Sequence, residues 1–133
     1  MGTLKKEVCN ARIVDTQLGI EDHGLLTFNL RCEFKDSYGK GTCSFGGCSF
    51  GSRCLNYDET YEYINVKFTS ELLMRVLTVV GVRNWEDIKG KLIRIRTNGR
   101  TGCAGGIEAI GNIIEDEWFC IEDFYREKEN EDK

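Results

Sequence analysis

The stretch Leu25–Phe34 reads LLTFNLRCEF, and from Leu26 onward apolar and polar residues alternate. Successive side chains of a β-strand point to opposite faces of a sheet, so this period of two predicts a strand with one buried face. The predicted inward residues are Leu26, Phe28, Leu30, Cys32 and Phe34. The opposite face would then meet solvent or a partner.

The segments on either side of this strand predict hairpins. Val8–Leu18 has the character of a strand with mixed burial, and residues 21–24 between the two have turn composition. A second turn over 35–41 leads into Gly39–Cys54, GKGTCSFGGCSFGSRC. Glycine weakens strands and is used where the backbone bends, bulges or approaches another surface closely. The stretch is therefore either a heavily bulged strand or backbone open to a ligand.

The second half of the chain predicts one main helix, at about residues 70–80. Thr69 or Ser70 can cap its first turn, and Gly81 is suited to end it. Its apolar stripe at helical spacing consists of Leu72, Leu73, Val76, Leu77 and Val80. The other expected elements are strands over 61–68, 91–97 and 107–114, with short helical turns near 84–89 and 117–127.

Together these elements predict an α+β fold with an antiparallel sheet of about five or six strands. We expect a single domain over residues 1–125, followed by a charged, frayed C-terminal tail over residues 126–133.

The composition is that of a soluble protein, with 41% hydrophobic and 30% charged residues. No apolar run is long enough to span a bilayer and the first residues lack a signal-peptide pattern, so we expect a cytoplasmic protein that does not enter membranes. The net charge of −4 argues against general duplex nucleic-acid binding. A local cluster of arginines would still suffice for a small anion.

The seven cysteines are expected to be reduced and to act mainly as small apolar side chains. Cys43, Cys48 and Cys54 do not have the paired-knuckle spacing of structural zinc sites, so no metal is predicted. Whether these three and Cys103 are free or metal-bound stays open. No nucleophile with a neighbouring base is identifiable, so no catalytic residue and no cofactor is predicted.

Two glycine-rich segments with nearby arginines and aromatic residues favour anion and nucleobase binding. Backbone N–H groups and guanidinium forks can hold phosphates, and aromatic rings can stack on bases. The candidate ligand-binding residues are Phe45, Phe50, Arg53, Asn84, Trp85, Arg94, Arg96, Asn98 and Arg100. Each also has an ordinary structural interpretation, in the core for the phenylalanines and on a solvated sheet face for Arg94 and Arg96.

Outward-facing polar but uncharged residues on the strands, such as Thr27 and Asn29, could meet a second copy of the chain, so we expect a homo-oligomer. Ligand pockets often form at such junctions between subunits.

Four segments carry a resemblance that covers roughly residues 8–125. They are ARIVDTQLGIEDHGLLTF (11–28), CSFGGCSF (43–50), LLMRVLTVVGVRNWEDIKGKLIRI (72–95) and IGNIIEDEWFCIEDF (110–124). The chain resembles small bacteriophage and prophage proteins, and is similar to anti-Thoeris nucleotide sponges of the Tad type. The cysteines at positions 43, 48 and 54 depart from that pattern.

The resemblance implies an anti-defence protein in the host cell cytoplasm. It would bind and sequester a small, cyclic nucleotide immune signal without cleaving it, and would not be an enzyme. Two alternatives stay open: a protein-binding inhibitor of a host defence complex, like an anti-CRISPR protein, or a small enzyme that degrades a nucleotide signal.

Overall fold

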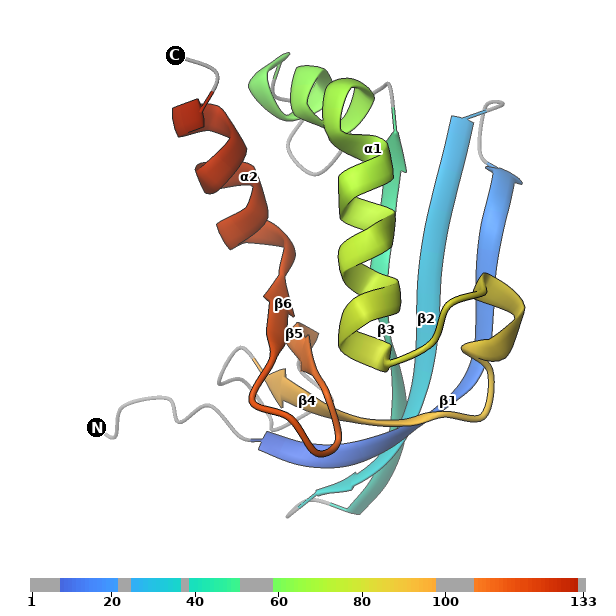
Figure 1. The fold of residues 1–133 in the computed structure, drawn as a ribbon. Coiled ribbons are helices and arrows are strands. Elements are labelled where there is room, and N and C mark those ends of the chain that lie inside the picture. Colours follow the sequence, from blue (N-terminus) through green and yellow to red (C-terminus); the bar gives the residue numbers. More distant parts are fainter. Residues whose placement is uncertain (1–7, 22–24, 37–38, 51–58, 98–106, 132–133) are drawn as a thin grey trace.

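The computed structural model describes residues 8–21, 25–36, 39–50, 59–97 and 107–131. The strands are β1 (Val8–Glu21), β2 (Leu25–Asp36), β3 (Gly39–Phe50), β4 (Leu92–Thr97), β5 (Ile107–Gly111) and β6 (Trp118–Cys120). The helices are α1 (Glu59–Val80), a 3₁₀ turn (Trp85–Asp87) and α2 (Ile121–Glu131). Figure 1 shows the longer part of α1 lying over the sheet, roughly parallel to β2 and β3, with α2 beside it. The predicted α+β fold is confirmed.

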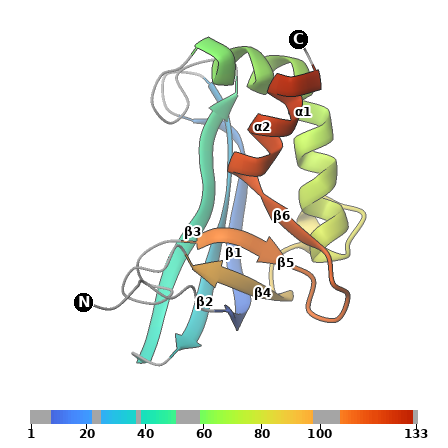
Figure 2. The ribbon, with the colours of Figure 1, turned by 90° about the vertical axis from the view of Figure 1, so that its left-hand side faces the viewer.

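The six strands form one sheet in the order β3-β2-β1-β4-β5-β6, and each neighbouring pair is antiparallel. In Figure 2 the long strands β1 to β3 stand on one side, with both helices on the other. Both described helices therefore cover the same face of the sheet. Among the described helices, none has an apolar stretch long enough to cross a membrane.

The alternation predicted for β2 is confirmed from Phe28 onward, because Phe28, Leu30, Cys32 and Phe34 are all buried. The side chain of Leu26, also predicted to face inward, lies outside the described residues. They face the helices together with inward residues of the neighbouring strands, namely Ile13, Ile93, Ile95 and Ile110. The helices contribute Leu72, Val76, Val79, Val80, Phe124 and Tyr125. Removing this apolar surface from water is the main favourable term that holds the helices on the sheet.

A chain of aromatic contacts runs through this core. Phe45 of β3 lies edge-on to Phe28 of β2, with ring centroids 6.5 Å apart, and to Phe119 of β6 at 6.2 Å. Phe28 in turn contacts Trp85 at 6.1 Å. Phe45 is only 2% exposed, so its proposed role in ligand binding is wrong. It occupies an inward position on β3, where a stacking ligand has no access.

The main helix is longer than the sequence predicted. Residues 61–68 were expected to form a strand, but α1 begins at Glu59 and includes them. The backbone departs from helical geometry at Phe68, with φ −114° and ψ 20°, so two helical segments meet there. The predicted start of the helix at Thr69 or Ser70 thus coincides with this kink. Gly81, with φ +90°, follows the last helical residue as expected.

The C-terminal region also differs from expectation. Trp118–Cys120 forms the edge strand β6 in place of the first turn of the predicted helix, and α2 begins at Ile121. The helix then continues to Glu131, so the expectation of a frayed tail from residue 126 is wrong for residues 126–131. Acidic Glu122 and Asp123 occupy its first turn, where their negative charges interact favourably with the positive end of the helix dipole.

The first part of the glycine-rich stretch forms the bulged edge strand that the sequence left as one of two interpretations. Between the Thr27–Ser49 and Asn29–Gly46 pairs, β3 contains one residue more than β2. Gly46 has φ +100°, and a Cβ there would lie 2.8 Å from the Phe28 ring. Glycine is needed at this position because it provides both the backbone conformation and the space for Phe28.

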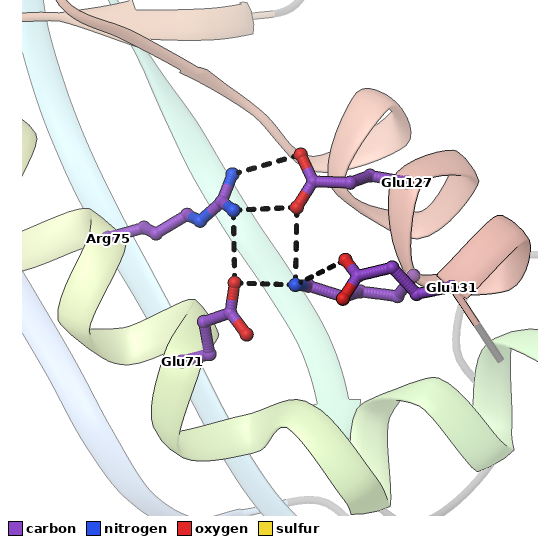
Figure 3. A network of polar contacts seen from close by, with 5 residues as sticks. Glu71, Arg75, Glu127 and Glu131 are labelled. Carbon is purple, nitrogen blue, oxygen red and sulfur yellow. Dashed lines mark hydrogen bonds and ion pairs between the residues drawn. The ribbon is translucent and has the colours of Figure 1, made fainter.

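A network of charged side chains joins α1 to α2 (Figure 3). Lys128 of α2 is only 4% exposed. Its Nζ lies 2.7 Å from a carboxylate oxygen of Glu71, 2.8 Å from one of Glu131 and 3.2 Å from one of Glu127. Arg75 of α1 completes the network, at 3.0 Å from Glu71 and 2.7 Å from Glu127.

The network favours the charged forms of Lys128 and Glu127. Burial acts to lower the pKa of Lys128, but hydrogen bonds to Glu131, Glu71 and Glu127 outweigh it and raise that pKa above its usual value. Burial likewise acts to raise the pKa of Glu127, but Arg75 and Lys128 outweigh it and lower that pKa. The two helices are therefore joined by oppositely charged side chains as well as by the apolar core.

Candidate functional site

The face of the sheet opposite the described helices is polar. Along β1 and β2, the residues between the buried ones are exposed and mostly charged, as with Arg12 and Glu33, which lie directly opposite each other. Among the described side chains, the exposed polar ones on this face of the three long strands are Asn10, Arg12, Asp15, Gln17, Arg31, Glu33, Lys35, Lys40, Thr42 and Ser44. The apolar Val8 of β1 is also exposed there, opposite Arg96. We call it the polar face, and it is where a polar ligand would have access.

Two arginines and a tryptophan gather at one end of the polar face. Arg94 and Arg96 alternate with the buried Ile93 and Ile95 on β4, so both point to the polar face. The guanidinium carbon of Arg94 lies 4.9 Å from the centroid of the Trp118 ring, and that of Arg96 lies 5.4 Å from it. Both distances fall within the range of cation–π contacts. We call these three residues the Arg–Trp cluster.

Trp118 reaches the arginines because Gly111 leaves room for its ring. Strand pairing places Arg94 opposite Gly111, and Gly111 opposite Trp118. A Cβ at Gly111 would lie 2.7 Å from the indole ring. This distance is too short for any residue other than glycine, so a side chain here would displace the ring. The ring therefore packs directly against Gly111, beside the guanidinium groups.

Arg94 is held in place by the loop between β5 and β6. Its Nε donates to the carbonyl oxygen of Asn112 at 2.7 Å, and its Nη2 donates to that of Glu115 at 2.8 Å. The Asn112 side chain fixes the loop in turn, because it donates to the Val79 carbonyl oxygen and accepts from the backbone N–H groups of Ile114 and Glu115. The loop between β5 and β6 is thus hydrogen-bonded both to the end of α1 and to Arg94.

Arg96 is paired with Glu108, whose carboxylate accepts from Nε at 2.7 Å. Glu108 is the extra residue of a bulge in β5, because the pairing moves from Arg96–Ala109 to Thr97–Ile107. The pair is half-buried, with side chains 31% and 22% exposed. Within the described part of the chain, the hydrogen bond of Arg96 to Glu108 uses Nε and not the Nη groups, which leaves donors for an anion.

This arrangement combines two kinds of recognition. Guanidinium planes stack on nucleobases as they do on indole rings, and their N–H groups bind phosphate oxygens in pairs. The single carboxylate of Glu108 offsets one of the two arginine charges, so the three side chains carry a net charge near +1. The cluster is suited to a small anion with an aromatic ring.

The structure brings together only some of the predicted site residues. Arg94 and Arg96 lie side by side, whereas the Trp85 indole N–H donates to Thr16 Oγ1 at 3.1 Å and its ring packs on Phe28. Asn84 is exposed and lines a separate hollow of about 560 Å³ with Arg83 and Lys89. Phe50 ends β3, but its side chain lies outside the described residues, as do Arg53, Asn98 and Arg100.

Sequence reasoning missed Trp118, Glu108, Gly111 and Asn112 as members of the site. Trp118 was assigned to a helix and Glu108 to the inside of a regular strand. The alternation in β4 indicated where its arginines point. It carried no information about which strand follows β5 in the sheet, and that strand is β6 with Trp118. The site depends on strand order, which local sequence patterns do not encode.

Among the cysteines that the structure describes, Cys9, Cys32, Cys43 and Cys120 form no disulfide. Across the described residues, no three or more His, Cys, Asp and Glu side chains come together in a group able to hold a metal ion. Cys32 faces Cys43 across the β2–β3 pair and is fully buried. Burial, with a smaller contribution from Cys43, raises the pKa of Cys32 to about 12.

Because of this raised pKa, we expect Cys32 to resist alkylation in the native protein. At pH 8, a thiol with a pKa of 12 is ionised in about one molecule in ten thousand, and only the thiolate reacts. Iodoacetamide labelling followed by peptide mass spectrometry should therefore modify the half-buried Cys43 long before Cys32. In denaturant the two should react at similar rates. Equal rates in the native protein would contradict the buried position of Cys32.

The fold and the site define an α+β protein with both described helices on one face of a six-stranded antiparallel sheet and an arginine–tryptophan cluster on the other. No protein-family model, curated protein or solved structure matches the chain significantly.

Proposed function

We propose that the protein binds a small nucleotide-derived anion at the Arg–Trp cluster and holds it without cleaving it. The observation that carries the proposal is the convergence of two guanidinium groups on one indole ring at the polar face. The base would stack on a guanidinium plane or on the exposed part of the ring, and a phosphate would accept from the Nη groups.

The cluster is organised before any ligand arrives, which favours binding. Arg94 is fixed by two backbone carbonyl oxygens, and Trp118 is fixed by its contact with Gly111. Side chains that are already ordered lose less conformational entropy when a ligand binds. Arg96 has its Nε committed to Glu108 and presents its Nη groups from a held position.

The resemblance to phage nucleotide sponges supplies the biological setting of the proposal. In that setting, the protein would sequester a cyclic nucleotide immune signal inside an infected host cell, as a homo-oligomer, and would thereby block the host defence. A binding protein needs only to hold the signal, so rigid arginines and a stacking ring are sufficient for this role.

The proposal can be tested by calorimetric titration with cyclic dinucleotides, cyclic trinucleotides and cyclic ADP-ribose isomers. We expect at least one of them to bind at micromolar protein. Arg96→Gln should weaken that binding by about tenfold to a hundredfold, as expected for the loss of charge-assisted hydrogen bonds. Arg126→Gln is the matched control, because Arg126 is an exposed arginine on α2. It should bind as the wild type does.

Two further measurements separate sequestration from the alternatives. After incubation with the bound nucleotide and denaturation, chromatography should recover the nucleotide intact, whereas an enzyme would release products. A stoichiometric host protein that co-purifies, together with no binding across the whole nucleotide panel, would favour a protein-binding inhibitor and would reject the proposal.

A further inference from the structure

A second group of cations lies on the polar face, in a hollow of about 210 Å³. Its polar lining residues are Asn10, Arg12, Glu33, Lys35 and Lys40, and its apolar lining residues are Ala11, Phe34 and Leu92. Three of these side chains are positive and one is negative, so the lining has an excess of positive charge. The volume is large enough for a phosphate group.

Lys35 and Lys40 lie directly opposite each other in the β2–β3 pair. Like charges at opposed positions destabilise a sheet, because the side chains are held about 5 Å apart at Cβ. Within the described residues, neither lysine makes an ion pair that would relieve this repulsion. An anion bound between them would relieve it.

Arg12 adds a third cation that is already positioned. It lies opposite Glu33 in the β1–β2 pair, and its Nη1 donates to the Gly90 carbonyl oxygen at 3.2 Å. This bond directs one side of the guanidinium toward the loop that precedes β4. Glu33 faces the same hollow, so the anion would be held mainly from the side of the lysines.

The strand register connects this hollow to the Arg–Trp cluster. Asn10 lies directly opposite Arg94 in the β1–β4 pair. On the other side of β1, the pairing with β2 ends at Ala11 and Phe34. The next residues beyond that pair are Asn10 on β1 and Lys35 on β2. Neighbouring strands lie about 4.8 Å apart, so Lys35 and Arg94, two strands apart, lie about 10 Å from each other along the sheet.

We propose that the hollow at Lys35 and Lys40 is a second anion subsite, which binds a phosphate of the same ligand that reaches the Arg–Trp cluster. This inference rests on the proposed function and narrows it. The ligand then carries at least two anionic groups, held by side chains whose backbone positions lie about 10 Å apart, and an aromatic ring at one end. Cyclic oligonucleotides and nucleotides with separated phosphates belong to this class, whereas a mononucleotide reaches only one subsite.

The subsite can be tested first without a nucleotide, with inorganic pyrophosphate as the probe and amide NMR shifts as the readout. We expect shifts at residues 10–12, 33–35 and 40. The double variant Lys35→Gln/Lys40→Gln should raise the Kd for pyrophosphate at least tenfold. Arg31→Gln removes a cation from the same strand and face outside the hollow, and it should leave the Kd unchanged. Shifts elsewhere, or an unchanged Kd in the double variant, would overturn the subsite.

The link between the two subsites needs a second comparison, between a cyclic dinucleotide and a mononucleotide. The double lysine variant should weaken the dinucleotide by tenfold or more and leave the mononucleotide unchanged. If pyrophosphate binds the hollow and no nucleotide binds at all, the proposed function fails and the link between the subsites fails with it. Tight, salt-dependent binding of a single-stranded hexanucleotide in preference to the small ligands would also overturn the assigned ligand class.

Discussion

We expect the replacement of Lys128 with methionine to lower the free energy of unfolding by about 2–3 kcal/mol at pH 7. Methionine has a similar length and no charge, so the change leaves Glu71, Glu127 and Glu131 close together without their shared cation. Removing one partner from a fully buried ion pair costs about 3–5 kcal/mol, and we reduce this figure because the carboxylates are partly exposed.

The effect should depend on pH in a way that identifies its origin. The pKa of Glu127 is lowered in the folded state, so its stabilising contribution is present above its unfolded pKa of about 4.3 and is lost as the pH falls through the folded value. The pKa of Lys128 is raised, so its contribution is present below about pH 10.4 and is lost as the pH rises further. The difference between wild type and Lys128→Met should therefore shrink below pH 4.

Urea denaturation of the wild type and Lys128→Met at pH 7 and at pH 3 measures the loss of stability and its decrease at low pH. Arg126→Met is the control, because Arg126 lies on the same helix and its ion pairs are 68% exposed. Exposed pairs contribute about 0–1 kcal/mol, so this variant should differ little from the wild type. A loss under 0.5 kcal/mol in Lys128→Met would show that the network does not join the helices energetically.

We expect the replacement of Gly46 with alanine to lower the free energy of unfolding by about 3 kcal/mol. Two effects add in this variant. The backbone there has φ +100°, which an L-residue adopts only with strain, and the new Cβ would lie 2.8 Å from the Phe28 ring and 3.0 Å from the Phe28 carbonyl oxygen. Phe28 is fully buried and contacts Phe45 and Trp85, so it has little freedom to move away.

Gly19→Ala is the matched control for this variant. Gly19 lies in the interior of β1, opposite Thr27, and a Cβ there would meet nothing within 4 Å. Alanine also restricts the unfolded chain, so this variant should be neutral or slightly stabilising. Thermal and urea denaturation of the two variants, measured side by side, give the comparison. Equal stability of Gly46→Ala and Gly19→Ala would contradict the assigned role of Gly46.

Local patterns predicted the fold wherever one period was clear over many residues. The alternation around Phe28 and the helical stripe around Val76 both lead to the correct element, because in each case one face is buried against the core. Residues 61–68 also alternate, yet they are helical. A short alternating run fits a strand and also part of a helix that packs on one side, so its period alone does not decide.

The candidate site was less predictable than the fold. The direction of Arg94 and Arg96 followed from the buried Ile93 and Ile95, which alternate with them. Trp118 lies in a strand of three residues, too short to show a period, and its contact with the arginines depends on the placement of β5 between β4 and β6. Phe45 was misassigned because an aromatic residue among glycines resembles an exposed stacking platform, whereas the glycines provide room for neighbouring core rings.

The pairing of β1 with β4 has a consequence for how the polar face is assembled. Strands β1 to β3 form one meander of consecutive hairpins, and β4 to β6 form another, with α1 in the connection between them. The lysines belong to the first meander, while the arginines and Trp118 belong to the second. The β1–β4 strand pair joins segments that are far apart in the sequence. Its paired residues run from Val8–Arg96 at one end to Arg12–Leu92 at the other. A ligand that contacts both groups of cations would cross the β1–β4 strand pair and would stabilise the association of the two halves of the sheet.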